Sequence, residues 1–457
     1  MTIGTPPAAF VPDLAGLRRN AAATLLRNWR GSATVPTGAL YPHQWSWDSA
    51  FIAIGLAHLS PRRAFAELTA LHGAQWGDGR VPQIVFNPAV PEDAYFPGPP
   101  FWRPLPRQGP AAGVSTTGLV QPPVHATAVL AVAERHPGDA TDAAVRQLYP
   151  RLARFHDYLF SRRRVASGLV GIVHPWESGL DNSPFWDEPL GAAGADLASA
   201  DLADDITGLR RDLRHADAGH RPTDEDYGRY MGIVAAYRDR GYADDDLLSL
   251  PFCTVDPLFC ALLAWSEHSL AELARRTGAD PGRHTERAQE LAYQLHTRLF
   301  DPALGCYVAL DARTGRPLRK RTVSGLVPLL LPGLPSGRRS ALVATLTGPA
   351  FGLGSRDVRG VPSYDLTAPD ADLHRYWRGP TWMNTNWLLW TALRRQGETR
   401  HAERLASDMV RLVADAGFRE YFHPVTGEGL GADHFSWTAA LLLDVLAREP
   451  GGQRWQR

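Results

Sequence analysis

Apolar residues recur with the helical period along most of the chain, in two alternating kinds of segment. One kind has an apolar face and an Arg-rich face, and it covers residues 14–30, 61–76, 141–163, 282–300, 337–349 and 399–416. The other is apolar on nearly all sides and covers residues 47–59, 121–135, 255–277, 322–331, 378–395 and 436–448. Helices that are apolar all round must be buried, whereas helices with a solvated face lie outside. The alternation predicts an all-α fold, a six-fold α/α toroid of six inner helices wrapped by six outer helices.

The long connections of the chain all lead into inner helices. They cover residues 31–46, 77–120, 164–254, 350–377 and 417–435. In a toroid the inner helices all run in the same direction, so these connections gather at one mouth, and long loops on a rigid scaffold are where sites are built. We therefore expect one catalytic domain over residues 14–448, with 164–254 as an inserted cap or lid at the mouth.

The expected lid contains one clear helix signal. Residues 221–241 read RPTDEDYGRYMGIVAAYRDRG, in which Thr223 is a candidate N-cap and Asp226 lies three residues further on. Residues 188–220 show no pattern that can be placed. We expect β-structure only in residues 301–322, as a hairpin.

The charge balance and the cysteines exclude several classes of protein. Lys and Arg together number 48 and Asp and Glu number 48, so there is no global positive field for nucleic acid or an anionic membrane. No apolar run approaches the ~18 residues of a membrane-spanning helix, and no signal peptide is recognisable. The three cysteines have no metal-binding spacing. We expect a cytoplasmic protein with buried, reduced thiols, no metal and no cofactor.

Tryptophan is abundant in segments that are expected to be loops or the starts of helices. Of the 14 Trp residues, these positions hold Trp45, Trp47, Trp76, Trp102, Trp176, Trp186, Trp377, Trp382 and Trp437. Trp rings at loop ends can stack on a ligand while the indole N–H donates a hydrogen bond, which suits a polar ring such as a sugar.

A first candidate catalytic segment is HPWESGLDNSPFWD at residues 174–187. It places Glu177, Asp181 and Asp187 among Trp, Phe and Pro side chains. Aromatic neighbours desolvate a carboxyl group and raise its pKa, which makes it a candidate general acid at neutral pH. The alternative is a structural loop in which Asp181 bonds local backbone in an Asx-turn. The residues by themselves favour neither interpretation.

A second carboxylate-rich segment, GFREYFHPVTGEGLGADHFSW, covers residues 417–437. It holds Glu420, Glu428 and Asp433, and the sharp turns that glycines allow would let Glu420 project toward the mouth. Alternatively, Glu420 pairs with the adjacent Arg419. A carboxyl on each side of one mouth is what glycoside hydrolysis requires, since one protonates the leaving oxygen and the other activates water.

Other candidate site residues each have a structural alternative. Asp48, near the start of the first inner helix, either caps that helix or accepts hydrogen bonds from sugar hydroxyls between Trp45 and Trp47. Arg221 and Tyr227 either lie on the surface or trap a small carboxylate. A histidine pair would instead suit a sugar isomerase, and the histidines near the expected mouth are His43, His125, His374 and His434.

Four long segments, in order, resemble hallmark stretches of glycoside hydrolase family 63. They are YPHQWSWDSAFIAIGLAHL, the WESGLDNSP box, DLHRYWRGPTWMNTNWLL and FREYFHPVTGEGLGADHFSWTAALLLD. Within that family the sequence is most similar to the compact bacterial hydrolases of glucosylglycerate and mannosylglycerate. The resemblance extends from about residue 14 to residue 448.

The resemblance implies an inverting α-glycosidase on a six-fold α/α barrel. It implies Asp181 as the general acid and Glu420 as the general base. Residues that match the sugar-ring subsite are Trp45, Trp47, Asp48, Gln121, Trp176, Trp377 and Trp382. Residues that match the glycerate subsite are Tyr41, Tyr95, Arg221, Tyr227 and Tyr376. The sequence departs from the expected pattern at Gln83, where related sequences are expected to have His.

The resemblance therefore implies hydrolysis of 2-O-α-D-glucosyl-D-glycerate, a small-molecule sugar glycoside, with mannosylglycerate as a second substrate. A broader α-glucosidase that acts on neutral α-glucosyl oligosaccharides is the alternative. A sugar-binding module without catalysis is disfavoured, because binding alone requires neither Asp181 nor Glu420. An outer surface with many Arg and few large apolar residues would permit a modest homo-oligomer interface.

Overall fold

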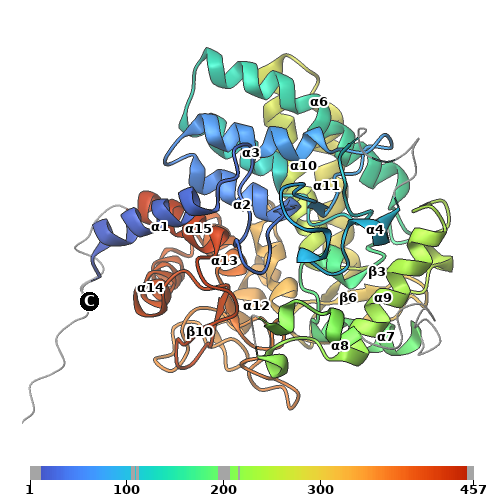
Figure 1. The fold of residues 1–457 in the computed structure, drawn as a ribbon. Coiled ribbons are helices and arrows are strands. Elements are labelled where there is room, and N and C mark those ends of the chain that lie inside the picture. The colour runs from blue at the N-terminus through green and yellow to red at the C-terminus, as the bar shows by residue number, and fades with distance from the viewer. Residues whose placement is uncertain (1–11, 104–108, 110–112, 194–205, 215–216, 450–457) are drawn as a thin grey trace, which may run out of the picture.

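The computed structural model describes residues 12–103, 109, 113–193, 206–214 and 217–449, and helices dominate it (Figure 1). The predicted outer segments form α1 (Leu14–Asn28), α3 (Pro61–Gly73), α6 (Asp139–Arg162), α11 (Gly282–Arg298), α12 (Ser336–Thr347) and α14 (Thr399–Ala416). The predicted inner segments form α2 (Ser46–Leu56), α5 (His125–Arg135), α10 (Pro257–Thr277), the 3-10 helix η8 (Val323–Leu330), α13 (Met383–Arg395) and α15 (Ser436–Arg448). Each predicted segment therefore contains a helix.

The six inner elements contact one another in a closed circuit. α2 contacts α5, α5 contacts α10, α10 contacts η8, η8 contacts α13, α13 contacts α15, and α15 returns to α2. Every residue of α2 is buried, whereas the outer helix α11 buries only His284, Ala288, Leu291 and Leu295. This burial contrast explains the two kinds of apolar pattern, and the arrangement is consistent with an α/α toroid.

The fourth inner element is a 3-10 helix, whereas the pattern predicted an α-helix. It contains Pro328, which has no N–H to donate and which hinders the α-helical bonding of the preceding turn. Its start is fixed by Ser324, whose hydroxyl donates to the Asp256 carboxylate and accepts from the Leu258 N–H at 3.0 Å. The apolar pattern therefore located this element correctly but did not determine the type of helix.

Short strands are more widespread than predicted. The expected hairpin region forms β4 (Phe300–Asp301) with β5 (Cys306–Tyr307), and β6 (Ala309–Asp311) with β7 (Pro317–Leu318). Further strands are β1 (Gln44–Trp45), β2 (Ile84–Val85), β3 (Thr254–Val255), β8 (Thr381–Trp382), β9 (Tyr421–Phe422) and β10 (Gly429–Leu430). The restriction of β-structure to 301–322 was wrong, because two-residue strands are too short to produce a periodic pattern.

These strands join the long connections immediately before inner helices. β1, which leads into α2, pairs with β2, and β8, which leads into α13, pairs with β9 in the register Trp382↔Tyr421. β9 also pairs with β10. The last connection is thereby fixed next to the one before α13, and Glu420 immediately precedes β9.

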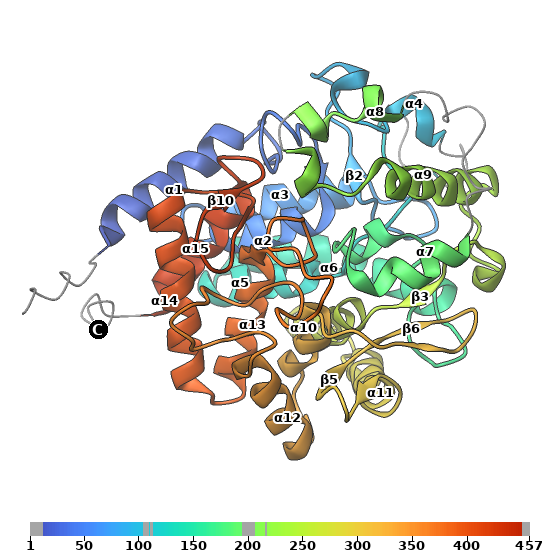
Figure 2. The same ribbon diagram turned by 90° about the horizontal axis from the view of Figure 1, so that it is seen from below.

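The predicted lid region is built of short helices around one longer one. It contains η2 (Pro175–Ser178), η3 (Pro184–Trp186), α7 (Asp187–Ala193), α8 (Ile206–Leu209), η5 (Asp212–Arg214), η6 (Ala218–His220), α9 (Asp224–Asp239) and η7 (Leu247–Ser249). α9 contacts α7 and α8, as Figure 2 shows, and it begins with the predicted capping box of Thr223 and Asp226. Of the segment 188–220, residues 194–205 and 215–216 lie outside the described structure.

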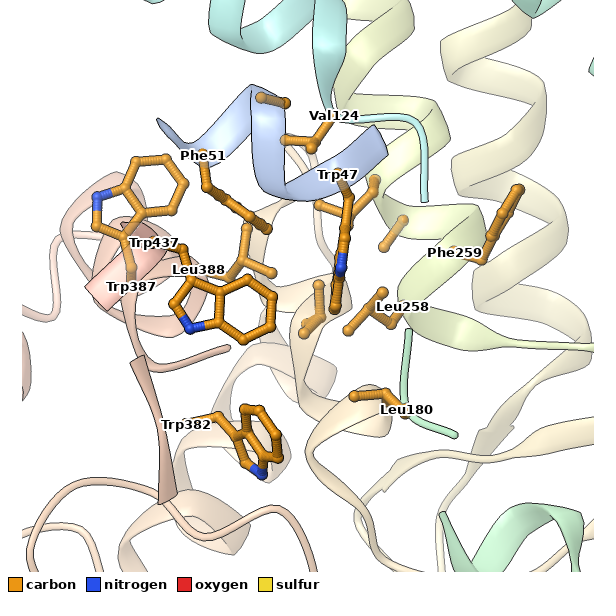
Figure 3. Close-up of a cluster of buried hydrophobic side chains, with 14 of the residues drawn as sticks. Trp47, Phe51, Val124, Leu180, Leu258, Phe259, Trp382, Trp387, Leu388 and Trp437 are labelled. Carbon is orange, nitrogen blue, oxygen red and sulfur yellow. The ribbon is translucent and has the colours of Figure 1, made fainter. Parts of the chain in front are cut away.

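The centre of the ring is filled by large side chains, drawn in Figure 3. The Trp47 and Trp437 rings pack edge to face with their centres 5.7 Å apart, and Leu258 and Leu388 are also buried there. The helices that carry the two Trp rings approach closely, because a Cβ added to Gly55 of α2 would lie 2.3 Å from the Cα of Ala440 in α15. Gly55 therefore permits the contact that closes the ring.

We predict that Gly55→Ala lowers stability by about 1–3 kcal/mol, because the methyl group overpacks a backbone contact between two buried helices. Thermal unfolding followed by circular dichroism checks this. The matched control is Gly73→Ala in α3, where an added Cβ meets nothing within 4 Å. An equal melting temperature for Gly55→Ala and the unmodified protein would show that α2 and α15 can separate at no cost.

Candidate active site

A pocket lies where the long connections meet, and it contains about 820 Å³ of space counted to its open mouth. Most of the site residues predicted from the sequence line it. These are Tyr41, Trp45, Trp47, Asp48, Tyr95, Gln121, Trp176, Asp181, Arg221, Tyr227, Tyr376, Trp377 and Glu420. The pocket combines several aromatic surfaces with four carboxyl groups, those of Asp48, Asp181, Asp212 and Glu420, and is therefore suited to a polar, ring-shaped ligand.

Asp181 reaches the pocket from the loop that follows η2. Gly179, with φ +72°, sets the direction of this loop, and a Cβ there would lie 2.5 Å from the Trp47 ring. The Asp181 carbonyl accepts a hydrogen bond from the Tyr230 hydroxyl of α9 at 3.0 Å. The pKa of the Asp181 carboxyl is raised to about 7, chiefly by burial; Arg221 opposes this rise and Glu420 adds to it. This carboxyl can therefore hold a proton near neutral pH.

The other two acidic residues of the same segment have different surroundings. Glu177 is buried in an ion pair with Arg163, at 2.9 Å between Nη1 and Oε2. Asp187 accepts two hydrogen bonds from Arg378, at 2.8 and 2.9 Å. The local turn is bonded by the Ser178 hydroxyl, which accepts from the Leu180 N–H at 2.9 Å. Asp181 is therefore the carboxyl of this segment that faces the pocket.

Glu420 also lines the pocket, and it belongs to the last long connection, residues 417–435. Its Oε1 accepts from the Tyr41 hydroxyl at 2.9 Å, and its Oε2 accepts from Arg221 Nη2 at 3.1 Å and from the Ala432 N–H at 2.9 Å. Gly431, with φ +67°, permits the last of these contacts, because a Cβ there would lie 2.5 Å from Oε2. The three donors fix both oxygens of this carboxylate.

The alternatives for the last long connection are resolved by its contacts. The Arg419 guanidinium approaches Asp433 at 3.9 Å, and no ion pair between Arg419 and Glu420 occurs in the described residues. Glu428 and Asp433 are exposed. Of the three acidic residues that this connection contributes, Glu420 is the one in the pocket.

Asp48 supplies another carboxyl of the pocket, from the first turn of α2. The N-cap of this helix is Trp45, and no side chain caps it, so the alternative that Asp48 is the cap was wrong. Burial raises the pKa of Asp48 well above its usual range, and the nearby Glu420, Glu67 and Asp181 raise it further. Asp48 can therefore present an oxygen to a ligand hydroxyl from the base of the pocket.

The aromatic wall has two layers. The rings of Trp377 and Trp382 are stacked with their centres 3.9 Å apart and an interplanar angle of 8°, and Trp382 stacks in turn on Tyr421. Trp377 lines the pocket, whereas Trp382 lies behind it and donates from its indole N–H to the Tyr376 carbonyl at 2.9 Å. The prediction that Trp382 itself lines the subsite was wrong, because Trp377 covers its face.

Arg221 is 3% exposed, which excludes the surface-pair alternative. Its Nη1 donates to the Tyr41 hydroxyl at 3.0 Å, its Nη2 donates to Glu420, and its guanidinium lies 4.6 Å from the centre of the Tyr376 ring. Its Nε is buried without a hydrogen-bond partner. Of the guanidinium predicted to trap a small carboxylate, two nitrogens are thus bonded within the site and one is unpaired.

Several lining residues were not among the predicted site residues. They are Pro36, Gln83, Phe96, Gly179, Arg211, Asp212, Pro222, Phe435 and Trp437. Gln83 and Trp437 each bury an unpaired polar atom, Oε1 and Nε1. Arg211 donates to the carbonyl and the carboxylate of Asp93, at 2.9 and 2.6 Å. The abundance of Trp could have identified Trp437, but nothing in residues 188–220 singled out Arg211.

The isomerase alternative receives no support from the placement of the histidines. His43, His125, His374 and His434 are not among the described residues that line the pocket. Burial lowers the pKa of His43 to about 4 and that of His125 well below its usual range. In the described part of the chain, no group of three or more His, Cys, Asp or Glu side chains is arranged to hold a metal.

The chain is similar to known proteins over most of its length. The model of the mannosylglycerate hydrolase MGH1-like glycoside hydrolase domain matches residues 41–438. The mannosylglycerate hydrolase of Rubrobacter radiotolerans is 41% identical over 95% of this chain and 98% of its own. The glucosylglycerate hydrolase of Mycolicibacterium hassiacum is 37% identical over 96% of this chain and 99% of its own.

A solved structure matches the fold. The GH63 mannosylglycerate hydrolase from Thermus thermophilus, in complex with Tris and D-glycerate, superposes with a TM-score of 0.84. It is 38% identical and the match covers 93% of this chain and 99% of that one. The protein is therefore a glycoside hydrolase. The chain belongs to the mannosylglycerate hydrolase MGH1-like family of GH63, which confirms the resemblance seen in the sequence.

One further property concerns membranes. Within residues 12–449, the helices that the structure describes are too short or too polar to cross a bilayer.

We predict that Gly431→Ala destabilises the protein and reduces turnover of an α-glycoside, because the new Cβ displaces the Glu420 carboxylate. Positive φ contributes about 1–3 kcal/mol of strain by itself. Gly278→Ala, which has φ +75° and open space around the new methyl group, reproduces that strain away from the pocket. Steady-state kinetics and thermal unfolding of both variants check this. Equal activity in the two variants would mean that Gly431 has no influence on Glu420.

Proposed function

We propose that the protein is an inverting α-glycosidase that hydrolyses 2-O-α-D-glucosyl-D-glycerate to glucose and glycerate, with mannosylglycerate as a second substrate. The observation that carries the proposal is a pair of carboxyls in contrasting surroundings in one aromatic pocket. Asp181 is desolvated, whereas Glu420 accepts hydrogen bonds on both oxygens. The named activities of the relatives support the choice of a glycerate glycoside.

In the proposed mechanism Asp181 transfers its proton to the glycosidic oxygen as the bond to the anomeric carbon breaks. Glu420 takes a proton from a water molecule that attacks the opposite face of the ring, through an oxocarbenium-like transition state. Glucose leaves with inverted configuration at the anomeric carbon, and glycerate leaves with the proton from Asp181. The net reaction consumes one water molecule and restores both carboxyls after one proton exchange with solvent.

We propose that the glycerate carboxylate binds near Arg221. The unpaired Nε supports this, because a buried donor without a partner costs free energy that a ligand acceptor would recover. Tyr41, Tyr95, Tyr227 and Tyr376 line the same pocket and would surround the rest of the glycerate group. In this assignment Arg221 serves two functions, since it also donates to Glu420.

We propose a six-fold α/α toroid over residues 14–448 as the scaffold, with 164–254 covering its mouth. The closed circuit of inner elements supports the toroid. Arg221, Pro222 and Tyr227, which line the pocket from this region, support its position over the mouth.

Time-resolved proton NMR with glucosylglycerate, mannosylglycerate and a neutral α-glucosyl disaccharide in parallel tests substrate and stereochemistry together. We expect β-glucose to form first from glucosylglycerate, with mannosylglycerate hydrolysed as well and the disaccharide left intact. Initial release of α-glucose would contradict inversion. Cleavage of the disaccharide alone would replace the proposal with the broader α-glucosidase.

The pKa of Asp181 predicts the pH dependence of kcat/KM. The free protein must carry a protonated Asp181, so kcat/KM should be highest well below pH 7, where Asp181 is fully protonated, and should fall as the pH rises through about 7. Well above the pKa, the fall should approach about tenfold per pH unit. Initial rates at substrate concentrations far below KM measure this profile. A flat profile from pH 6 to 9 would assign proton donation to another group.

The proposed glycerate contact predicts a selective loss of affinity in Arg221→Ala. The inhibition constant of D-glycerate should rise about tenfold or more, because charge-assisted hydrogen bonds are lost. Glycerol, which has the same length but no carboxylate, should inhibit the variant and the unmodified protein equally. The kcat for glucosylglycerate should also fall, since Glu420 loses a donor. An unchanged inhibition constant for D-glycerate would remove Arg221 from the glycerate site.

A further inference from the structure

A buried ionic network that the proposed mechanism does not use lies directly behind the loop of Asp181. Its centre is Glu177, which is 0% exposed and lies in η2. Oε1 accepts from the Val120 N–H at 3.1 Å and from Arg163 Nη2 at 3.0 Å. Oε2 accepts from Arg163 Nη1 at 2.9 Å and from the Val173 N–H at 2.8 Å. This carboxylate therefore has four donors, two of them from the backbone of separate connections.

The network continues from Arg163 to the region of α9. Arg163 Nε lies 2.9 Å from Asp244 Oδ1, and Arg163 Nη2 donates to the Tyr237 hydroxyl at 3.0 Å. Asp244 also accepts from the hydroxyls of Tyr158 and Tyr237, each at 2.6 Å, and pairs with Arg80 at 3.3 Å. α6, the Glu177 loop and α9 are thus joined by bonds among groups that water does not reach.

The Glu177 part of the network is close in sequence to two pocket residues. Glu177 precedes Asp181 by four residues, and Val120 is followed by Gln121, which accepts from the Trp47 N–H at 3.2 Å. The loop that carries Asp181, called the acid loop from here on, is also bonded to α9, because the Tyr230 hydroxyl donates to the Asp181 carbonyl. The backbone around Asp181 is therefore bonded from two directions.

Stability alone is a weak explanation for such a network. Charges lose their hydration when they are buried, and well-packed apolar residues of similar volume are often neutral or more stabilising. What directional bonds provide is a fixed geometry, and a general acid must be held close to the oxygen that it protonates. The placement of the network around the acid loop favours this role.

We infer that Glu177 is a positioning residue for catalysis, which together with Tyr230 holds the Asp181 loop at the distance and in the desolvated surroundings that proton donation requires. The inference rests on the proposed function of Asp181 as the general acid. Glu177 has no place in the pocket lining and contacts no reacting atom. It acts through the backbone that it fixes.

The test variant is Glu177→Gln, which keeps the shape of the side chain but removes one of the two carboxylates that pair with Arg163 and replaces one acceptor with a donor. The loop should shift and admit water, so kcat should fall about tenfold or more while KM changes less than about threefold. The alkaline limb of kcat/KM should move to lower pH, because both hydration and the less compensated positive charge of Arg163 favour the ionised acid.

A matched control separates this effect from general destabilisation. Glu267 in α10 is also 0% exposed, and it pairs with His156 at 3.0 Å and with His284 at 2.5 Å. Neither partner belongs to the acid loop or to the pocket lining. Glu267→Gln should lower the melting temperature but leave kcat and the alkaline limb of the folded fraction unchanged.

Tyr230→Phe keeps the inference testable if Glu177→Gln does not fold, since it removes one hydroxyl and leaves the ring in place. We expect kcat to fall about threefold to tenfold at nearly constant KM, because the Asp181 carbonyl loses its donor. Its control is Tyr149→Phe, which removes a hydroxyl bonded to His284 at 3.3 Å. Controls and test variants with the same kcat and the same alkaline limb would overturn the inference.

Asp181→Asn distinguishes the failure of the inference from the failure of the proposed function. If Asp181→Asn retains activity on glucosylglycerate, the proposed mechanism is wrong. If Asp181→Asn is inactive while Tyr230→Phe and folded Glu177→Gln behave like their controls, the mechanism stands and Glu177 is purely structural.

Discussion

The ion pair of Arg163 and Glu177 is the interaction on which the acid side of this pocket depends. Both side chains are fully buried, and their bidentate contact binds the end of α6 to the loop that carries Asp181. Removing one charge of this pair is costly, because the other loses a partner in a medium that solvates ions poorly. The loop, the neighbouring connection at Val120 and α9 are therefore fixed together.

The pocket lining combines two guanidinium groups, those of Arg211 and Arg221, with four carboxyls. Arg221 lies beside Glu420 and opposes the upward shift in the pKa of Asp181, whereas Glu420 is close enough to Asp48 to add to the rise in the pKa of Asp48. Burial is the largest cause of the raised pKa of Asp181. Differences in hydrogen bonding also separate the proposed general base from the proposed general acid. The Glu420 carboxylate accepts from three donors. The Asp181 carboxyl faces the pocket, and it is the Asp181 carbonyl that accepts from Tyr230.

Much of the site could be predicted because family motifs and aromatic composition lie in contiguous segments. Asp181, Glu420 and most of the aromatic residues assigned from these segments line the pocket. Trp382 was misplaced, because a motif identifies a residue but does not say which of two stacked rings faces the ligand. Arg211 was missed, since its place depends on Asp93, 118 residues away, and on a segment without periodic pattern.

The sequence by itself determined the inner and outer helices, because burial on all sides or on one face leaves a periodic record in the residues of each helix. It also determined the capping box that starts α9, since its bonds lie within four residues. Only the tertiary structure decided that Arg221 bonds Glu420 across 199 positions and that Glu177 is a structural ion pair whereas Asp181 faces the pocket. The pairing of Arg221 with Glu420 arises only when connections far apart in the sequence meet at the pocket, and their local sequences contain no information about one another.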